Sequence, residues 1–426
     1  MKLRLALIEK MKKLNLTILF LLIFVSQSFA ALDSLRVMNW NLLNFAGTDT
    51  TRVKYYRDVI SYSNPDIFIC QEISGVNANR VLFKQVFESF APGQYDTCTF
   101  DMGPDTGNLL FFKKSRARFI SNTPIRTELR YITEFKMYIP YIADTVRFFS
   151  CHLKASSGSA NELQRGREVD TLRYYTNRLP LGKYFIMTGD FNIYSANEVA
   201  YQKLQAITIG EGQLYDPIVG MTGTWANASY AFYHTQSPRV RSFGGGATGG
   251  MDDRFDLLLH SKAMTLPANK FYMTYSRGRY FTVGNDGNHY NDSINKLPNT
   301  AAPLAVVNGI HYASDHCPIM GVYFMNGTTN IVTQTSNVAN NFSLGQNYPN
   351  PFNPSTTINF DLPVSAFVSL VVFDMNGKEI MNLVNGNKSQ GRFSVNVDAS
   401  ALPSGTYFYR LRAGNFVSMK KMILLK

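Results

Sequence analysis

The chain has 426 residues, 45% of them hydrophobic and 13% aromatic, which is ample for a sizeable folded core and more than one ordinary domain needs. The formal net charge of +12 is divided evenly, because residues 1–30, 32–341 and 342–426 each carry +4. The charge balance by itself therefore gives no argument for nucleic-acid binding.

Residues 1–30 have the layout of a secretory signal peptide. Three lysines within residues 10–13 precede an apolar run over residues 14–25, and the small residues Ser28 and Ala30 follow. The run is shorter than the roughly 20 residues that span a bilayer. We expect cleavage after Ala30, export of the chain and no stable membrane span.

Residues 31–325 alternate apolar strands with helices. Helices are expected at residues 51–61, capped near Thr50, and at residues 161–178, where Leu163, Val169, Leu172 and Tyr175 recur at helical spacing. The pattern predicts two stacked sheets covered by helices, an α/β sandwich. The main expected strands are residues 35–45, 65–73, 145–153, 183–192, 255–261 and 317–324.

Residues 326–341, NGTTNIVTQTSNVANN, are poor in charge and rich in Asn and Thr, which is typical of a linker. Beyond it, residues 342–426 alternate apolar side chains about the turns Asn376-Gly377 and Gly414-Asn415. This pattern predicts a second domain, a small all-β immunoglobulin-like sandwich. Having no histidine and four acidic residues, it is not expected to be catalytic.

The four cysteines allow two disulfides in an exported chain. Cys70, Cys151 and Cys317 each lie in or beside an apolar strand, so buried free thiols fit equally well. No cysteine or histidine spacing indicates structural zinc.

Polar side chains stand at the ends of the expected strands. Any one of them is explained by a turn, a cap or a hydrogen bond in the core. Together they are harder to explain, because several carboxylates at strand ends are costly to bury unless a positive group neutralises them. A divalent cation and a phosphate would do so, and oxygen ligands without cysteine favour Mg²⁺, with Mn²⁺ or Ca²⁺ as alternatives. The set comprises Asn41, Glu72, His152, Asp190, Asn192, Asp256, Asp315 and His316.

Five sequence blocks, MNWN, PDIFICQE, SCHLKA, TGDFN and SDHCPI, follow one another across residues 35–325, with a looser sixth block, DDRFDLLL. In this order they resemble the endonuclease/exonuclease/phosphatase superfamily, which includes deoxyribonucleases, apurinic endonucleases, sphingomyelinases and inositol polyphosphate 5-phosphatases. The resemblance implies a divalent-metal-dependent hydrolase in which an activated water cleaves a phosphoester bond.

The resemblance also implies roles for single residues. Glu72 is similar to the main metal ligand of the family, with Asn41 and Asp315 beside the metal and phosphate. Asp190 is similar to the residue that orients or deprotonates the attacking water, and Asn192 to the amide that holds this water or a phosphate oxygen. Asp190 and Asn192 are two positions apart, so on a strand both side chains project to the same side.

The remaining candidates face the phosphate. His316 is similar to the histidine that contacts the scissile phosphate, Asp256 to the carboxylate that fixes its ring, and His152 to a second phosphate-facing histidine. Lys154 and Arg254 are expected to contact phosphate as well, although an arginine just before a core strand is also compatible with a structural role.

The substrate class stays open at this stage. Apurinic endonucleases usually have tyrosine in place of His152 and Thr-Lys in place of Ile73-Ser74, so the sequence is nearer to the deoxyribonuclease and sphingomyelinase branches. The arginines of residues 237–254, around a glycine run, suit a groove for nucleic acid or a mobile surface loop. The aromatic side chains of residues 271–283 suit a lipid-touching or base-stacking hairpin, or an ordinary hairpin.

An extracellular nuclease acting on DNA or RNA is the function we expect, with nucleic acid as substrate. The alternatives are a sphingomyelinase-like or other phosphoesterase, and a non-catalytic surface binding protein on the same scaffold. Retention of Glu72, Asp190 and His316 favours an enzyme.

The segments LGQNYPNPFNPSTTINFDLP and LPSGTYFYRLRAGNF resemble the C-terminal sorting domains of the type IX secretion system, with a generic immunoglobulin-like stalk as the alternative. This resemblance implies that the type IX secretion machinery is a partner and that the protein is secreted or held at the cell surface. A monomer is expected.

Overall fold

The computed structural model describes residues 33–208, 210–242, 244–326, 333–335, 341–399 and 402–425. The predicted signal peptide, residues 1–30, lies outside this part of the chain. Among the described helices, none combines the length and the apolar composition needed to cross a membrane.

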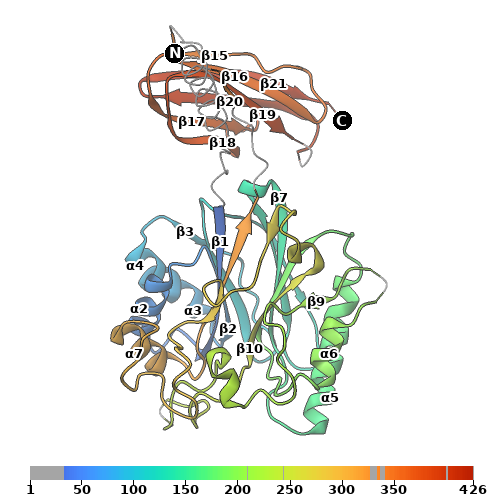
Figure 1. The fold of residues 1–426 in the computed structure, drawn as a ribbon, viewed down its shortest axis with the longest axis vertical. Helices are drawn as coiled ribbons and strands as arrows, with labels where there is room; N and C mark the ends of the chain where they lie inside the picture. Colours follow the sequence, from blue (N-terminus) through green and yellow to red (C-terminus); the bar gives the residue numbers. More distant parts are fainter. Residues whose placement is uncertain are drawn as a thin grey trace, which may run out of the picture. The chain divides into compact units, whose positions relative to one another are not determined.

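Two mixed sheets form the larger body (Figure 1). The first sheet has the order β11-β13-β1-β2-β4-β3, with β12 also paired to β13. The second has the order β5-β6-β7-β8-β10-β9. The strands of the first sheet are β1 (Asp33–Phe45), β2 (Ile67–Ile73), β3 (Tyr95–Thr97), β4 (Gly107–Lys113), β11 (Phe271–Tyr272), β12 (Tyr280–Thr282) and β13 (Ile319–Met325), and those of the second are β5 (Arg118–Ile125), β6 (Ile132–Ile139), β7 (Asp144–His152), β8 (Tyr184–Asp190), β9 (Leu214–Tyr215) and β10 (Asp256–Ser261).

Helices cover both outer faces of this pair of sheets, as Figure 1 shows. One group packs on the first sheet, and α5 with α6 pack on the second. The expected α/β sandwich is confirmed. The elements are α2 (Val53–Ser63), α3 (Val76–Val81), η1 (Leu82–Phe87), α4 (Glu88–Phe90) and α7 (Leu304–Ala313) in the first group, α5 (Ser159–Thr176) and α6 (Val199–Gln205) in the second, and the short turns η2 (Pro140–Ile142), η3 (Ala228–Tyr233) and η4 (Lys262–Thr265).

Two local predictions for the helices need correction. Helix α2 begins at Val53 with Arg52 as its N-cap and no side-chain cap, so Thr50 contributes only its carbonyl, which accepts from Val53 N. In α5, Leu163 and Tyr175 are exposed, whereas the inner face buries charged side chains alongside Val169 and Leu172. The spacing of apolar residues does not reveal this face, because the face also buries charged side chains. Arg165, for example, forms a buried ion pair with Glu198.

The C-terminal residues form two four-stranded antiparallel sheets with their own apolar core. This confirms the all-β sandwich and both predicted turns, which join β17 to β18 and β20 to β21. A short strand, β14, lies within the predicted linker and pairs with β19. The strands are β14 (Thr333–Thr335), β15 (Ser343–Leu344), β16 (Ser355–Leu362), β17 (Ala366–Phe373), β18 (Glu379–Lys388), β19 (Gly391–Asp398), β20 (Gly405–Ala413) and β21 (Phe416–Leu424).

All four cysteines, Cys70, Cys98, Cys151 and Cys317, are free and buried. The structure thus decides between the two readings of the sequence in favour of free thiols.

Candidate active site

Strand register brings three of the predicted site residues into one row at an edge of the second sheet. Strands β7 and β8 are parallel, with His152 opposite Asp190. Strand β10 runs antiparallel to β8 and begins with Asp256, also opposite Asp190. Since β7 and β8 end where β10 begins, the three side chains meet at that edge.

The first sheet contributes Asn41 near the end of β1, Glu72 near the end of β2, and His316 just before β13. Glu72 has a left-handed backbone (φ 56°), and the pairing of β2 with β4 shifts register between Cys70 and Ile73. A bulge of this kind re-aims a side chain, and backbone strain in a non-glycine residue often marks a functional position.

Gly189 explains how β8 delivers Asp190 to this edge. Its φ is +146°, and a Cβ at this position would lie 2.0 Å from the carbonyl oxygen of Cys151 on β7. Only glycine permits so close an approach of the two backbones. The glycine of the TGDFN block is therefore required for the position of the carboxylate that follows it.

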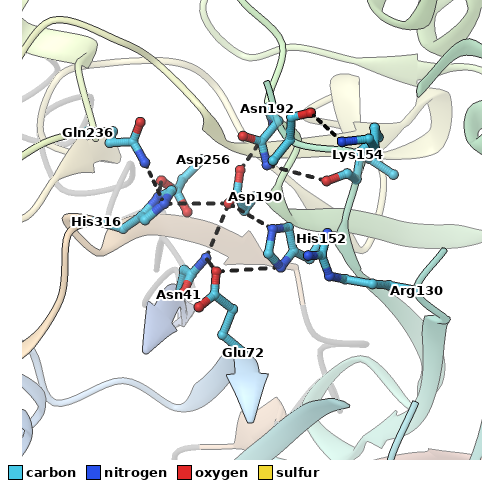
Figure 2. Close-up of polar contacts among 12 residues, drawn as sticks. Asn41, Glu72, Arg130, His152, Lys154, Asp190, Asn192, Gln236, Asp256 and His316 are labelled. Atoms are coloured by element: carbon cyan, nitrogen blue, oxygen red, sulfur yellow. Dashed lines mark hydrogen bonds and ion pairs between the residues drawn. The ribbon is translucent and has the colours of Figure 1, made fainter. Parts of the chain in front are cut away.

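Asp190 lies at the centre of the site (Figure 2). Asn41 Nδ2 donates to Glu72 Oε1 (2.9 Å) and to Asp190 Oδ2 (3.2 Å), and Asn192 N donates to Asp190 Oδ1 (3.1 Å). Burial raises the pKa of Asp190 to about 7. The positive charge of His316 opposes this shift, and the negative charges of Asp256 and Glu72 add to it. This carboxyl group is thus set to exchange a proton near neutral pH.

His316 is held by Asp256 at Nδ1. Its Nδ1 is 2.7 Å from Asp256 Oδ2, and its Nε2 is 2.9 Å from Gln236 Nε2 and 3.5 Å from Asp190 Oδ2. Burial alone lowers the pKa of His316, but the carboxylates of Asp256 and Asp190 outweigh it and raise this pKa well above its usual value. The imidazole is therefore cationic at neutral pH.

His152 has the opposite character. Its Nε2 is 3.5 Å from Asp190 Oδ2, and its Nδ1 is 3.7 Å from Glu72 Oε1. Burial, with Arg130 and His316 nearby, lowers the pKa of His152 well below its usual value. The site thus contains one cationic and one neutral imidazole around the same carboxylate.

Glu72, His152 and Asp190 have ligand atoms within 4.8 Å of one another, a grouping that fits a metal ion. Glu72 and Asp190 bring two carboxyl groups together beside His152, a donor set that suits a divalent cation. Asp315 is outside this grouping: its Oδ2 accepts from Ala247 N (2.6 Å), and its Oδ1 is buried with no hydrogen-bond partner among the described residues. A role for Asp315 as a ligand stays a prediction.

The two predicted phosphate contacts differ in position. Lys154 is half-buried beside the site, and its Nζ donates to the carbonyl of Ala155 (3.0 Å; Figure 2). Arg254 is fully buried, and its guanidinium pairs with both carboxylate oxygens of Asp216 (2.7 and 2.9 Å). The expectation that Arg254 contacts phosphate is therefore wrong, since its charge and donors serve the interior.

The glycine-rich segment 237–254 does not form the basic groove that its sequence suggested. Arg239 is buried, like Arg254, and only Arg241 is exposed. The segment instead contacts the site through its backbone at Ala247. A Cβ on Gly246 (φ +82°) would lie 2.6 Å from the carboxylate of Asp315, so glycine is needed there.

Sequence reasoning missed two residues of the site, Arg130 and Gln236. Arg130 precedes β6 and lies next to His152 in Figure 2, with Nε donating to Asp105 (2.8 Å) and Nη1 buried without a hydrogen-bond partner in the described part of the chain. Gln236 contacts His316 from a loop. Neither residue follows a strand, so the strand-end criterion excluded both.

The Endonuclease/Exonuclease/phosphatase family model matches residues 38–316, and the Secretion system C-terminal sorting domain model matches residues 346–425. No curated protein matches the chain.

Similar solved structures include D. rerio TDP2 in complex with a single-strand DNA product, with 17% identity, a TM-score of 0.45, and coverage of 68% of this chain and 99% of that one. Another is a mannosyl-6-phosphatase from Bacteroides thetaiotaomicron, with 16% identity, a TM-score of 0.42, and coverage of 68% and 99%. The human Nocturnin catalytic domain with a bound sulfate anion has 16% identity, a TM-score of 0.42, and coverage of 68% and 95%.

The C-terminal match indicates export through the type IX secretion system, to the cell surface or beyond. The larger match covers more than half of the chain and the whole set of strand ends described above. The chain is therefore a member of the endonuclease/exonuclease/phosphatase family, an exported phosphoesterase that carries a secretion-system sorting domain.

Proposed function

We propose that the protein is a divalent-metal-dependent phosphodiesterase and, within this class, an extracellular nuclease. The observation that carries the proposal is the pairing of a cationic His316 with Asp190, a carboxyl group whose pKa is about 7, at a separation of 3.5 Å. One group can accept a proton while the other donates a hydrogen bond to the substrate.

Asp190 takes the proton of the attacking water. A pKa near 7 leaves about half of this carboxyl group ionised at neutral pH, and the ionised form is basic enough to accept a proton. The backbone N–H of Asn192 holds one oxygen of this carboxylate, which leaves the other facing the site. The side-chain amide of Asn192 donates to the carbonyl of Leu153 (3.3 Å) and lies beside the water position.

His316 stabilises the phosphate. Asp256 fixes the ring through Nδ1, so the protonated Nε2 can donate to a nonbridging oxygen of the substrate. The cationic ring offsets the negative charge that grows on this oxygen in the transition state.

Glu72, with Asn41 beside it, is the side chain that we propose to hold the divalent cation. Its carboxylate is the partly exposed member of the group, with 13% of its side-chain surface open to solvent. Such an ion, when bound, polarises the phosphoryl group and offsets charge, which is commonly worth several kcal/mol.

Arg130 is our candidate for a phosphate anchor. Its Nε donates to Asp105, while the buried Nη1 has no partner among the described residues, and the side chain of Arg130 lies beside His152 (Figure 2). An unpaired buried guanidinium nitrogen is costly, and an anionic oxygen would satisfy it.

Residues 271–283 do not form the hairpin that the sequence suggested, because β11 and β12 both pair with β13 and not with each other. The segment nevertheless favours a nuclease over a sphingomyelinase. Its large apolar side chains Phe271, Met273 and Tyr280 are buried in the core. The tip exposes Ser276 and Arg277 instead. This surface has no apolar wedge for entry into lipid and presents a cation.

The proposal is tested by incubating the purified chain with Mg²⁺ and one substrate at a time. The substrates are plasmid DNA, RNA, sphingomyelin vesicles and a sugar phosphate. We expect cleavage of nucleic acid that is abolished by a chelator and by Asp190→Asn. Release of choline phosphate from the vesicles or of phosphate from the sugar, with the nucleic acids intact, would refute the nuclease. Equal activity of Asp190→Asn and the unaltered chain would remove Asp190 from the mechanism.

A further inference from the structure

A cavity of about 820 Å³ lies outside the group of side chains around Asp190. Its walls come from the end of α2, from η3, and from β12 with the loop that follows it. The volume is within the range of small-ligand sites, roughly 300–1,000 Å³. Two of its aromatic side chains are exposed, Tyr62 to 50% and Phe232 to 38%. Exposed rings at a cavity offer stacking surfaces that the core does not use.

The charge that lines this cavity is positive. The guanidinium of Arg277 lies 4.0 Å from the centre of the Phe232 ring. Arg36 donates from Nη2 to the carbonyl of Ser63 (2.8 Å), while its Nε is buried with no hydrogen-bond partner in the described residues. Rings next to guanidinium groups suit a ligand that has both a flat face and a negative charge.

Asp286 is the one acidic residue among the described residues that line the cavity, and its carboxylate is already satisfied. It accepts from His289 Nδ1 (2.9 Å), from Asn288 N (3.0 Å) and from Thr300 N (3.0 Å). These contacts occupy both of its oxygens. Asp286 keeps its negative charge but has no free oxygen for a ligand, and the two arginines of the lining outnumber it, so the net charge of the lining is positive.

The cavity is tied to the catalytic histidine by a short segment. Phe232 lines the cavity, and Gln236, four residues on, contacts His316. An extended chain of four residues spans at most about 14 Å, so the two positions are no farther apart than this. Asn285 fixes the segment by donating to the carbonyls of Ala231 (2.8 Å) and His234 (3.1 Å). A few nucleotides of one strand bridge such a distance, since each rises about 3.4 Å.

We infer that this cavity holds one nucleotide of the substrate strand a few positions from the scissile phosphate. The base stacks on Tyr62, because Arg277 already covers the ring of Phe232, and the phosphate meets Arg277 and Arg36. This inference rests on the proposed nuclease function, because it gives the same enzyme a second contact with its substrate. Single-stranded nucleic acid fits best, since a base must leave the helix to stack on a protein ring.

Binding of a fluorescently labelled single-stranded DNA of eight nucleotides, followed by anisotropy, tests the inference. The Asp190→Asn protein serves as the background, so that the oligonucleotide stays intact. We expect Tyr62→Ala to weaken binding by about tenfold, because stacking on an aromatic ring contributes about that much per base. Arg277→Ala should weaken it by a similar factor, because the phosphate loses a cationic partner. Thermal unfolding of each variant verifies the fold.

Arg178→Ala is the matched control. Arg178 is also an exposed arginine over an aromatic ring, 3.4 Å from the centre of Tyr174, but it lies beyond the far end of the 18-residue helix α5. If Tyr62→Ala and Arg277→Ala bind as tightly as this control, the inference is overturned while the nuclease stands. If the Asp190→Asn protein binds no oligonucleotide, the inference is overturned too. Plasmid cleavage by the unaltered chain decides the nuclease function separately.

Discussion

Replacing Asp256 by asparagine tests the pairing on which the mechanism depends. The side chain keeps its shape, but the buried charge 2.7 Å from His316 Nδ1 disappears. A hydrogen bond to a charged group contributes about 1.5–3 kcal/mol. At about 1.4 kcal/mol per tenfold in rate, we expect kcat/KM for a phosphodiester to fall roughly 10- to 150-fold.

The pH profile of this variant carries a second prediction. Asp256 raises the pKa of both His316 and Asp190, so its removal lowers both. Activity requires ionised Asp190 and cationic His316, and therefore both limbs of the pH–rate profile should move to lower pH. The interaction of Asp256 with His316 also stabilises the folded state, because it raises the pKa of the histidine there. The stabilisation is complete below the unfolded pKa of about 6.5 and is lost as the pH rises through the folded pKa.

The assay is hydrolysis of a chromogenic phosphodiester from pH 5 to 10 at saturating Mg²⁺. Asp252→Asn is the control, because it neutralises a carboxylate of the same segment that is not among those paired with His316. An alkaline limb at the same pH in Asp256→Asn and in the unaltered chain would refute the argument, since His316 would then not owe its charge to Asp256.

Three further substitutions have defined outcomes. Gly189→Ala places a Cβ 2.0 Å from the Cys151 carbonyl, so we expect loss of more than 90% of the activity and a lower thermal midpoint. Asp216→Asn leaves the buried guanidinium of Arg254 without its anion, and urea unfolding should show a loss of about 3–5 kcal/mol. Glu72→Gln removes the proposed anionic ligand, so the Mg²⁺ concentration for half-maximal activity should rise at least tenfold.

Each of these has an outcome that contradicts it. Full activity of Gly189→Ala would mean that β7 and β8 separate without cost. An unfolding free energy of Asp216→Asn equal to that of the unaltered chain would show that the Arg254 pair is not structural. Unchanged Mg²⁺ dependence in Glu72→Gln would move the cation to other ligands.

The sequence predicts those parts of the fold and of the site that depend on residues close together in the chain. Apolar runs located the strands that carry Asn41, Glu72, His152 and Asp190, because a buried strand needs a continuous apolar segment. Residues at the ends of adjacent strands then have to meet, whatever the rest of the chain does. This is why most of the predicted site residues lie together.

The remainder depends on partners far away in the chain. The sequence shows that Arg254 is charged, but it does not show that Arg254 pairs with Asp216, 38 residues earlier. It therefore cannot distinguish a phosphate contact from a structural ion pair. Arg130 and Gln236 belong to segments without a strand-end pattern and reach the site only through the packing of other elements. No local rule reports such contacts, which are set by tertiary structure.

The buried thiols have a consequence for a protein that leaves the cell. Burial raises the pKa of Cys70, Cys98, Cys151 and Cys317 above its usual value, so little thiolate forms at neutral pH. With neither cross-links to make nor reactive sulfur to protect, the chain reaches its native state without help from oxidising enzymes. Through these four thiols, at least, neither the fold nor the site responds to the redox state of the surroundings.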